Sequence, residues 1–376
     1  MDKKRRVSRR SFLKCGAATT IGALAVPGLA PSRAWAASSV AANERITLGV
    51  IGLGKLGLWS HVMAFLGNPG AQIVAVCDVE RNRLVEAQGI VNNHYAAERE
   101  KGAYRGCDIY GDFRELLARD DIDGVVIATP DHWHGVISVA AAKAGKDIYC
   151  EKPMSHDIAE GRAVVEAVRR YGRVYQTGSQ QRSEYNGVFR RAVELVQAGA
   201  IGELKTIDVG VSGPPHMDYD LPAEPVPESL DWDMWLGPSP VRPYNAVLCP
   251  MDSKNSGWPA WRNYREFGSG YYSDMGAHHF DIAQWALGMD DSGPVEIIPP
   301  NGKDVDRLMY RYTNGVTVHQ GGAADDVFHG TEGTIYVSRD YIRTEPEGIL
   351  QTPLRAGDPH YNRGRDHRED WLECIR

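Results

Sequence analysis

Three glycines with a fixed spacing are the first residues of the chain that suggest chemistry. Gly52-x-Gly54-x-x-Gly57 follows an apolar run, and Lys55 and Leu56 stand before the last glycine. Such glycines allow a tight turn and a close approach of the backbone to a diphosphate, which then lies at the N-terminus of the next helix. The spacing predicts a dinucleotide site, with a glycine turn that binds nothing as the alternative.

An acidic residue downstream of this turn bears on the kind of dinucleotide. Asp78 lies 21 residues beyond Gly57, at the end of a second apolar run. A carboxylate at this position accepts hydrogen bonds from a ribose 2′-hydroxyl and repels a 2′-phosphate. We therefore expect NAD as the cofactor and NADP to be disfavoured. Arg81 and Arg83 are the nearby residues that could instead receive a phosphate.

Three further side chains could serve the oxidation of an alcohol. Lys152 stands between Glu151 and Pro153, and Asp274 precedes His278 by four residues. Oxidation of a secondary alcohol moves a hydride to a nicotinamide and a proton to a base, and histidine titrates in the right range to accept that proton. A lysine ammonium stabilises the developing alkoxide. On one helix, Asp274 and His278 would share a face, so that the carboxylate could orient the imidazole.

Each of these candidates has a structural alternative. Lys152 could be a surface lysine. His278 could be a histidine of the core, in which case its neighbour His279 would be the candidate base. Asp274, His278 and Asp281 lie at positions i, i+4 and i+7 and could hold a metal ion, although we expect none. Otherwise Asp281 is expected to orient His278 or to cap a neighbouring element, and His279 is expected to be structural.

A second group of residues has the composition of a carbohydrate site. Aromatic rings stack on the apolar C–H faces of sugars, and charged side chains hydrogen-bond to their hydroxyls. Each aromatic residue could equally belong to a core. The residues expected to contact a substrate are Arg182, Tyr185, Trp261, Arg262, Tyr272, Asp274 and His278, with Trp258 and Tyr271 as aromatic neighbours.

Apolar strands that alternate with helices are expected to position the glycine turn, Asp78 and Lys152. Alternation of this kind is typical of a parallel sheet covered by helices on both faces. We assign residues 45–178 to a Rossmann domain of the α/β class. The expected strands are 46–51, 71–78, 124–129, 147–150 and 173–178, and the expected helices include 55–67 and 81–99.

The texture of the chain changes after residue 178, and we assign residues 179–376 to a second domain. Residues 214–262 are rich in Pro and Trp, which predicts an ordered excursion over a site rather than a disordered linker. The remainder predicts an α+β domain with a mostly antiparallel, open sheet. Its expected elements are helices at 185–198 and 277–288 and strands at 294–298, 306–312, 316–320 and 334–338.

The N-terminus has the order of a targeting peptide. Basic residues precede an apolar run at 15–30, and Ala34-Trp35-Ala36 fits a cleavage site. Arg9 and Arg10 within Ser-Arg-Arg-Ser-Phe-Leu-Lys indicate the twin-arginine (Tat) route for residues 1–36. A membrane anchor is the alternative, but the apolar run is shorter than the roughly 20 residues of a spanning helix. We therefore expect a periplasmic protein without stable membrane association after cleavage.

Net charge excludes several classes of partner. Residues 1–36 carry eight Lys/Arg and one Asp, so the rest of the chain has 34 basic against 48 acidic residues, a net charge of −14. Such a chain is not expected to bind nucleic acid or anionic membranes. Its five remaining cysteines are scattered, which indicates neither a disulfide framework nor a zinc site.

Taken together, these motifs resemble the Gfo/Idh/MocA family of oxidoreductases. The stretches that carry the resemblance are the glycine turn, ATPDHWHGVISVAAAKAGKDIYCEKPM at 128–154, GSQQRS at 178–183 and GSGYYSDMGAHHFDIAQWALG at 268–288. The resemblance covers about residues 45–345. It implies a Rossmann domain followed by an α/β domain whose open sheet mediates a dimer or tetramer. It also implies a continuation beyond HREDWLECIR, so we expect this C-terminus to be truncated or unusual.

The resemblance also assigns roles to individual residues. It implies that Lys152 contacts the reacting hydroxyl, that the Lys152–Pro153 bond is cis, and that His278 is the general base. Thr129 and Pro130 match a turn that lines the nicotinamide side. The full set of expected cofactor-binding residues is Gly52, Gly54, Lys55, Leu56, Gly57, Asp78, Arg83, Thr129, Pro130, His134, Glu151 and Lys152.

These inferences lead to one expected function and two alternatives. We expect a periplasmic, NAD-dependent oxidoreductase that acts on a secondary hydroxyl of a sugar, glycoside or polyol. Because the periplasm has no nicotinamide pool, its cofactor would stay bound and be recycled in place. The first alternative is glycoside cleavage through transient oxidation at C3 and elimination. The second is a non-catalytic sugar-binding protein.

Overall fold

Six parallel strands form the first sheet, as the alternation of strands and helices predicts. The structure is a computed structural model, and it describes residues 44–211, 213–322, 324–361 and 366–376. The expected export signal at 1–36 lies outside these ranges. The strands are β1 Ile46–Ile51, β2 Ala71–Cys77, β3 Asp108–Tyr110, β4 Gly124–Ile127, β5 Asp147–Cys150 and β6 Tyr175–Thr177. Their order is β3-β2-β1-β4-β5-β6. The order reverses between β1 and β4, where folds of this type bind ligands.

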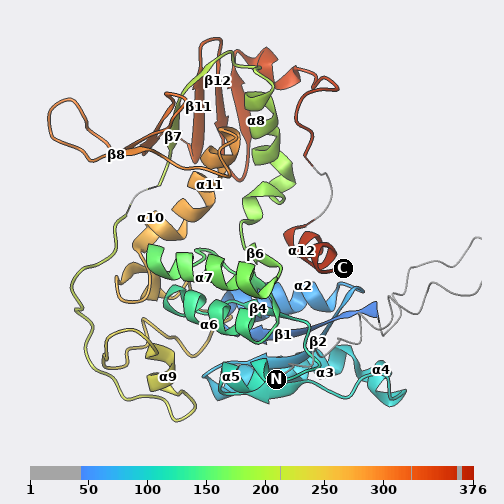
Figure 1. The fold of residues 1–376 in the computed structure, drawn as a ribbon. Coiled ribbons are helices and arrows are strands. Elements are labelled where there is room, and N and C mark those ends of the chain that lie inside the picture. Colours follow the sequence, from blue (N-terminus) through green and yellow to red (C-terminus); the bar gives the residue numbers. More distant parts are fainter. Residues whose placement is uncertain (1–43, 212, 323, 362–365) are drawn as a thin grey trace, which may run out of the picture. The chain divides into compact units, whose positions relative to one another are not determined.

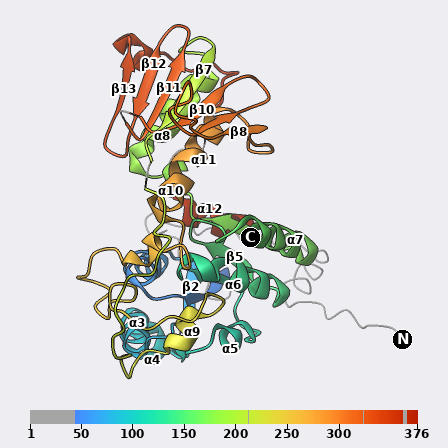
Figure 2. The ribbon, with the colours of Figure 1, turned by 90° about the vertical axis from the view of Figure 1, so that its left-hand side faces the viewer.

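Helices cover both faces of this sheet because its central strands are apolar on both sides. All seven residues of β2 are buried, for example. The helices α5, Phe113–Leu117, α6, Asp131–Lys143, and α7, Ile158–Tyr171, follow one another in contact (Figures 1 and 2). The helix expected at 55–67 is a π-helix, η2, Gly57–Val62, continued by α2, Met63–Leu66. The region expected to be helical at 81–99 forms α3, Arg81–His94, and α4, Ala96–Glu100.

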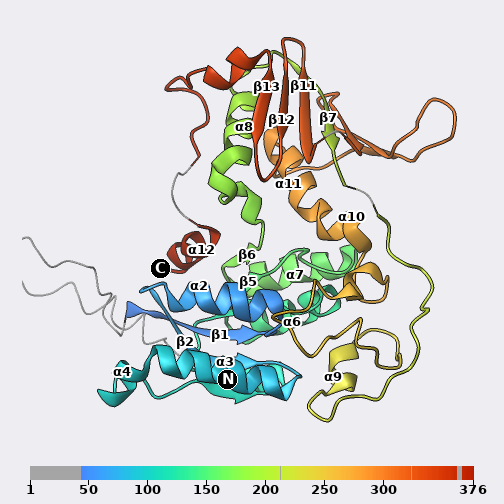
Figure 3. The same ribbon diagram turned by 180° about the vertical axis from the view of Figure 1, so that it is seen from behind.

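The second sheet has seven strands and is mostly antiparallel, as expected. Its order is β13-β12-β11-β7-β10-β9-β8, and only β7 and β10 pair in parallel. The helices α8, Val188–Gln197, and α11, Gly276–Ala286, pack against it (Figure 3). The sequence did not suggest β7, β11 or β13, which carry polar residues. The strands are β7 Leu204–Val209, β8 Glu296–Ile298, β9 Met309–Arg311, β10 Thr317–Gln320, β11 Asp326–Gly330, β12 Thr334–Val337 and β13 Ile342–Glu345.

The segment 214–262, called here the Trp-rich segment, is ordered as predicted. It contains only short helices, α9, Trp232–Leu236, and η5, Ala260–Asn263. Its rings nevertheless build a small core of their own, in which Trp232 and Trp235 stack with centroids 4.6 Å apart. Backbone hydrogen bonds join the segment to the turn between β2 and α3, from Arg81 N to Ser229 O and from Asp231 N to Val79 O.

The last helix differs from the expected division of the chain at residue 178. Helix α12, His367–Ile375, inserts Trp371 into the core of the first sheet, where the ring is fully buried. Its ring lies edge-on to Phe65 and to Tyr149, each with a centroid distance of 5.9 Å. The second domain therefore excludes α12. None of the helices in the described ranges is long and apolar enough to cross a bilayer.

The packing of α12 predicts a large effect of one truncation. Trp371→Ala should lower the free energy of unfolding by about 3–5 kcal/mol, because it removes a buried ring and leaves a cavity. Thermal and denaturant unfolding measure this change. Cys374→Ser, at an exposed position of the same helix, is the matched control. Equal stability of the two variants would show that α12 does not pack in this core.

Candidate active site

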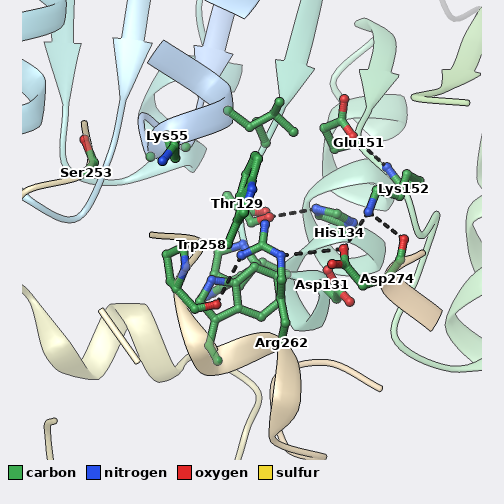
Figure 4. Close-up of a pocket in the computed structure, with 18 of the residues that line it drawn as sticks. Lys55, Thr129, Asp131, His134, Glu151, Lys152, Ser253, Trp258, Arg262 and Asp274 are labelled. Atoms are coloured by element: carbon green, nitrogen blue, oxygen red, sulfur yellow. Dashed lines mark hydrogen bonds and ion pairs between the residues drawn. The ribbon is translucent and has the colours of Figure 1, made fainter. Parts of the chain in front are cut away.

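One cavity of about 680 Å³ brings together most of the residues singled out in the sequence. Its walls come from the carboxyl ends of β1, β2, β4 and β5, from the Trp-rich segment and from the region around α10, Gly270–Asp274. Figure 4 shows Lys55 and Ser253 on one side of this cavity and Lys152 and Asp274 on the other. The cavity therefore joins the dinucleotide turn to the expected reacting end.

The glycine turn has the geometry that its spacing predicts. Gly52 has φ +89°, and a Cβ there would lie 2.7 Å from the backbone of Ala128 and Thr129. A Cβ at Gly57 would lie 1.9 Å from the carbonyl oxygen of Gly52, so only glycine lets the helix pack so closely. A Cβ at Gly54 would meet no protein atom within 4 Å, and Gly54 lines the cavity. The turn thus leaves open the backbone approach that a diphosphate requires.

Asp78 favours NAD over NADP. The Asp78 carboxylate accepts hydrogen bonds from Leu53 N at 2.6 Å and Glu80 N at 2.8 Å, which hold it at the end of β2 on the cavity wall. Arg83 Nη2 donates to Pro250 O at 2.7 Å. One terminal nitrogen of its guanidinium is therefore engaged by the Trp-rich segment, whereas its Nε is buried without a partner among the described residues. The residues present fit a bound NAD.

Lys152 is anchored across the cavity. Its Nζ donates to Asp274 O at 2.7 Å and to Asp274 Oδ1 at 2.5 Å (Figure 4). Arg262 Nε lies 3.5 Å from the same carboxylate oxygen. Burial opposes ionisation of Asp274, but the charges of Lys152 and Arg262 outweigh it and hold its pKa below the usual value. The Lys152–Pro153 bond is cis, as the resemblance implied.

Glu151 precedes Lys152, and its carboxylate is held by several hydrogen bonds. Its buried carboxylate receives hydrogen bonds from His61 Nε2 at 2.8 Å, Gln180 Nε2 at 2.6 Å and Lys152 N at 3.2 Å. Arg368 Nε donates to His61 Nδ1 at 3.2 Å, so the other ring nitrogen carries the proton given to Glu151. Burial opposes ionisation of Glu151, yet the His61 hydrogen bond and nearby positive charges lower its pKa to about 2.

His278 lies on the cavity wall and is neutral at physiological pH. Its side chain is 5% exposed, and burial together with the charges of Lys152 and Arg339 lowers its pKa to about 3. Its Nδ1 is buried without a hydrogen-bond partner among the described residues. A buried, unpaired nitrogen is costly, so a polar ligand group beside this ring would be stabilised.

The expected orientation of His278 by Asp274 or Asp281 is wrong. Met275, between α10 and α11, keeps helical backbone angles of φ −88° and ψ −31°. In the described chain, however, the Asp274 carboxylate accepts a hydrogen bond from Lys152 and not from His278. Asp281 binds Arg182. His279 is structural, as expected, because its Nδ1 lies 3.0 Å from Oδ2 of the buried Asp326.

Two expected substrate residues also lie elsewhere. The Arg182 guanidinium pairs with Asp281 at 2.7 Å and Asp290 at 2.8 Å, and Arg182 does not line the cavity. The Tyr272 hydroxyl contacts that of Tyr310, and its ring packs against the second core. Because neighbouring residues on a helix point in different directions, Tyr271 lines the cavity in its place. Tyr185, Trp261 and Arg262 line the cavity as expected.

His134 ties two turns of the cavity wall together. Its Nδ1 lies 2.6 Å from Pro153 O and its Nε2 lies 2.9 Å from Thr129 O. Thr129, Pro130 and His134 all line the cavity, as the resemblance implied. The Thr129 hydroxyl oxygen is buried without a partner in the described part of the chain, which again suits a polar ligand.

Sequence reasoning missed four charged residues that line the cavity, namely Asp131, Glu184, Arg339 and Arg368. Asp131 is buried, and burial raises its pKa to about 6. It directly follows Pro130, so its place after the Thr-Pro turn was a usable signal. Arg339 lies between β12 and β13 and had no local signal, because only the folding of the second sheet brings it to the cavity.

The low pKa of His278 predicts a pH-dependent contribution to stability. Below about pH 6.5, the usual histidine value, the unfolded chain binds a proton at this residue that the folded chain excludes down to about pH 3. Stability present at neutral pH is therefore lost as the pH falls. Replacing His278 with Gln removes this loss, so between pH 7 and pH 5 the variant should gain roughly 2 kcal/mol relative to the parent.

Unfolding midpoints of parent and His278→Gln from pH 5 to 7 measure this gain. Met275→Leu, which alters the same wall without a titratable group, is the control. A parent–variant difference that stays constant with pH would contradict the assignment of a neutral, buried imidazole.

Known proteins share both halves of this architecture. A glycosyl hydrolase family 109 protein of Shewanella baltica is 31% identical over 214 residues, which is 53% of this chain and 44% of that protein. A myo-inositol 2-dehydrogenase of Thermotoga maritima is 24% identical over 341 residues, covering 88% of this chain and 83% of that protein. The chain spans only about half the length of several curated relatives that it matches.

A solved structure and two family matches agree on the fold. The aldose-aldose oxidoreductase of Caulobacter crescentus superimposes with a TM-score of 0.55 at 17% identity, covering 88% of each chain. Residues 46–179 match the description "Oxidoreductase family, NAD-binding Rossmann fold", and residues 216–347 match "Oxidoreductase family, C-terminal alpha/beta domain". Two matches to successive domains of one family, together with the glycine turn and the Glu-Lys-Pro turn, place this chain in the GFO/IDH/MocA family of oxidoreductases.

Proposed function

We propose that this chain oxidises and reduces a secondary hydroxyl of a sugar, glycoside or polyol with NAD. One observation carries the proposal: the Lys152 ammonium and the neutral imidazole of His278 line the same cavity as the glycine turn and Asp78. Bound NAD supplies the hydride acceptor and donor. The names of the relatives, a myo-inositol 2-dehydrogenase and an aldose-aldose oxidoreductase, support a polyol or sugar as substrate.

The residues of the chain itself would bind the substrate, stabilise its charge and accept its proton. Lys152 donates hydrogen bonds and stabilises negative charge on the substrate oxygen, while Asp274 fixes its position. His278 accepts the hydroxyl proton, which a neutral ring can do. Trp261 and Trp258 flank the Arg262 guanidinium, with ring centroids 4.2 and 5.0 Å away, and form a wall suited to sugar C–H faces.

Substitution of the two reacting residues tests these roles. Lys152→Met and His278→Gln should each lower kcat roughly 10²- to 10⁴-fold, the usual value of a positioned acid or base, while NAD affinity changes little. The assay follows absorbance of the reduced cofactor with a panel of sugars and polyols. Lys143→Met, at an exposed position on α6, is the matched control. Full activity of the Lys152 or His278 variant would contradict the assigned role.

We further propose that the cofactor stays bound and is recycled in place. The Trp-rich segment lies against the residues that would hold it. Lys55 Nζ donates to Ser256 O at 2.8 Å, and Arg83 Nη2 donates to Pro250 O at 2.7 Å. Lys254 lies over the ring of Trp59 on η2, 4.4 Å from its centroid. These contacts would have to open before a bound dinucleotide could leave.

Purification without added nucleotide tests cofactor retention. The protein should carry near one equivalent of NAD(H), measured in the supernatant after denaturation. Lys254→Ala removes one contact of the segment and should accelerate release, whereas Lys303→Ala, on an exposed loop, should not. Absence of nucleotide together with weak NAD binding on titration would contradict retention.

A periplasmic location, reached by the Tat route, is part of the same proposal. The twin arginine and the apolar run at 15–30 support it. Replacing Arg9 and Arg10 together with Lys should leave the protein in the cytoplasm of a Tat-competent host, as fractionation would show. The pair Arg5→Lys and Arg6→Lys keeps the twin arginine and should still be exported. Export of the Arg9/Arg10 variant would overturn this route.

Glycoside cleavage is the second candidate, and the similarity to a glycosyl hydrolase family 109 protein favours it. In this reaction, transient oxidation by NAD acidifies a neighbouring C–H, and the aglycone leaves as an alcohol by elimination. Water then adds to the unsaturated ketosugar, and the reduced cofactor returns the hydride, so the net reaction is hydrolysis. The two candidates differ in product. A released aglycone without a ketosugar supports cleavage, whereas a ketosugar with the aglycone still attached supports oxidation and reduction alone.

A further inference from the structure

Arg339 is a cation of the cavity that the proposed chemistry leaves unused. Its guanidinium lies over the ring of Tyr185, 4.8 Å from the centroid, and both residues line the cavity. Its Nε donates to Gln181 Oε1 at 2.9 Å, and its Nη2 reaches only the Met275 sulfur at 4.0 Å. Within the described ranges no carboxylate pairs with this guanidinium.

The acids nearest to Arg339 in the cavity wall have other partners. The Asp274 carboxylate forms ion pairs with both Lys152 and Arg262. Glu184 lies 2.9 Å from His367 Nε2 and 3.5 Å from Arg368 Nη1. Asp325 reaches only the backbone amide of Arg339, at 3.4 Å. Asp131 and Glu151 also line the cavity. Among the described residues, the Arg339 guanidinium therefore has no carboxylate at ion-pair distance.

The guanidinium is also held in a fixed orientation. Gln181, which accepts from its Nε, is 1% exposed and lies 3.5 Å from His278 O and 3.4 Å from His279 Nδ1. The stacked Tyr185 ring supports the guanidinium face. With Nε occupied, the two terminal nitrogens are left for a ligand, and a planar guanidinium binds a carboxylate through two parallel hydrogen bonds.

We propose that the substrate carries a carboxylate, as in a uronic acid or its glycoside, and that Arg339 binds this group. This inference rests on the proposed function, because it names the class of sugar that the site takes. A carboxylate supplies the bidentate partner that the Arg339 guanidinium lacks among the described residues. A phosphate ester carries about −1.5 to −2 at neutral pH and would require a further cation.

Paired ligands that differ only in the acid group test the proposal. The probes are methyl glucoside, galactoside and mannoside, each with its uronate counterpart and its 6-phosphate. Binding to the NAD-loaded protein is measured by tryptophan fluorescence, and cofactor reduction by absorbance. We expect the uronate of at least one pair to bind roughly ten- to a hundredfold more tightly than its neutral partner, as for a charge-assisted contact.

Two variants and a control test whether Arg339 causes the preference for the uronate over the neutral sugar. Arg339→Gln should reduce the ratio of uronate to neutral affinity to near one while neutral sugars still bind, and Arg339→Lys should restore part of it. Arg343→Gln removes an exposed arginine of β13 that pairs with Glu345 and should leave the ratio unchanged. Retained NAD(H) and an unchanged unfolding midpoint show that each variant is folded.

The outcomes separate this inference from the proposed function. Equal affinity for neutral and acidic partners, or a preference that survives Arg339→Gln, overturns the carboxylate site and leaves the oxidoreductase intact. Tighter binding of the phosphates than of the uronates also overturns it. If no probe binds or reduces the cofactor, the sugar oxidoreductase is overturned together with this inference.

Discussion

The ion pair between Lys152 and Asp274 is the interaction on which the rest of the site depends. Lys152 follows β5 of the first sheet, whereas Asp274 ends α10, which leads into the helix of the second core. The ammonium binds both the carboxylate and the backbone carbonyl of Asp274. A partly buried charge without such a partner would be strongly destabilising, so this pair fixes the lysine and the end of α10 together.

The same cation helps to set the state of its neighbours. Burial already disfavours a charged His278, and the positive charges of Lys152 and Arg339 add to that effect. The imidazole is thereby kept neutral, with one ring nitrogen free of a proton, and the same effects lower its basicity. On the other side of the lysine, Glu151 carries a negative charge that His61 and Gln180 hold in place. Arg368, on the last helix, bonds to His61, so α12 supports the reacting turn from behind.

Local sequence predicted those parts of the site that depend on a single short segment of the chain. The glycine turn, Asp78 at the end of β2 and Lys152 after β5 are each defined by a strand and the residues that follow it. Residue spacing failed at His278, because the Asp274 carboxylate that was expected to orient this ring pairs with Lys152 and Arg262 instead. Residue type failed at Arg182 and Tyr272, since arginine and tyrosine serve ion pairs and cores as readily as ligands.

The sequence by itself determined the two-domain class, the parallel sheet and the dinucleotide turn, and it singled out the lysine and the histidine that line the cavity. These features follow from periodicity and from short motifs, which act over a few residues. Only the tertiary structure decided that Asp274 forms an ion pair with Lys152, that α12 packs on the first sheet and that Arg339 lines the cavity. Each of these contacts joins residues far apart in the chain, and such contacts depend on how whole elements pack, which local patterns do not encode.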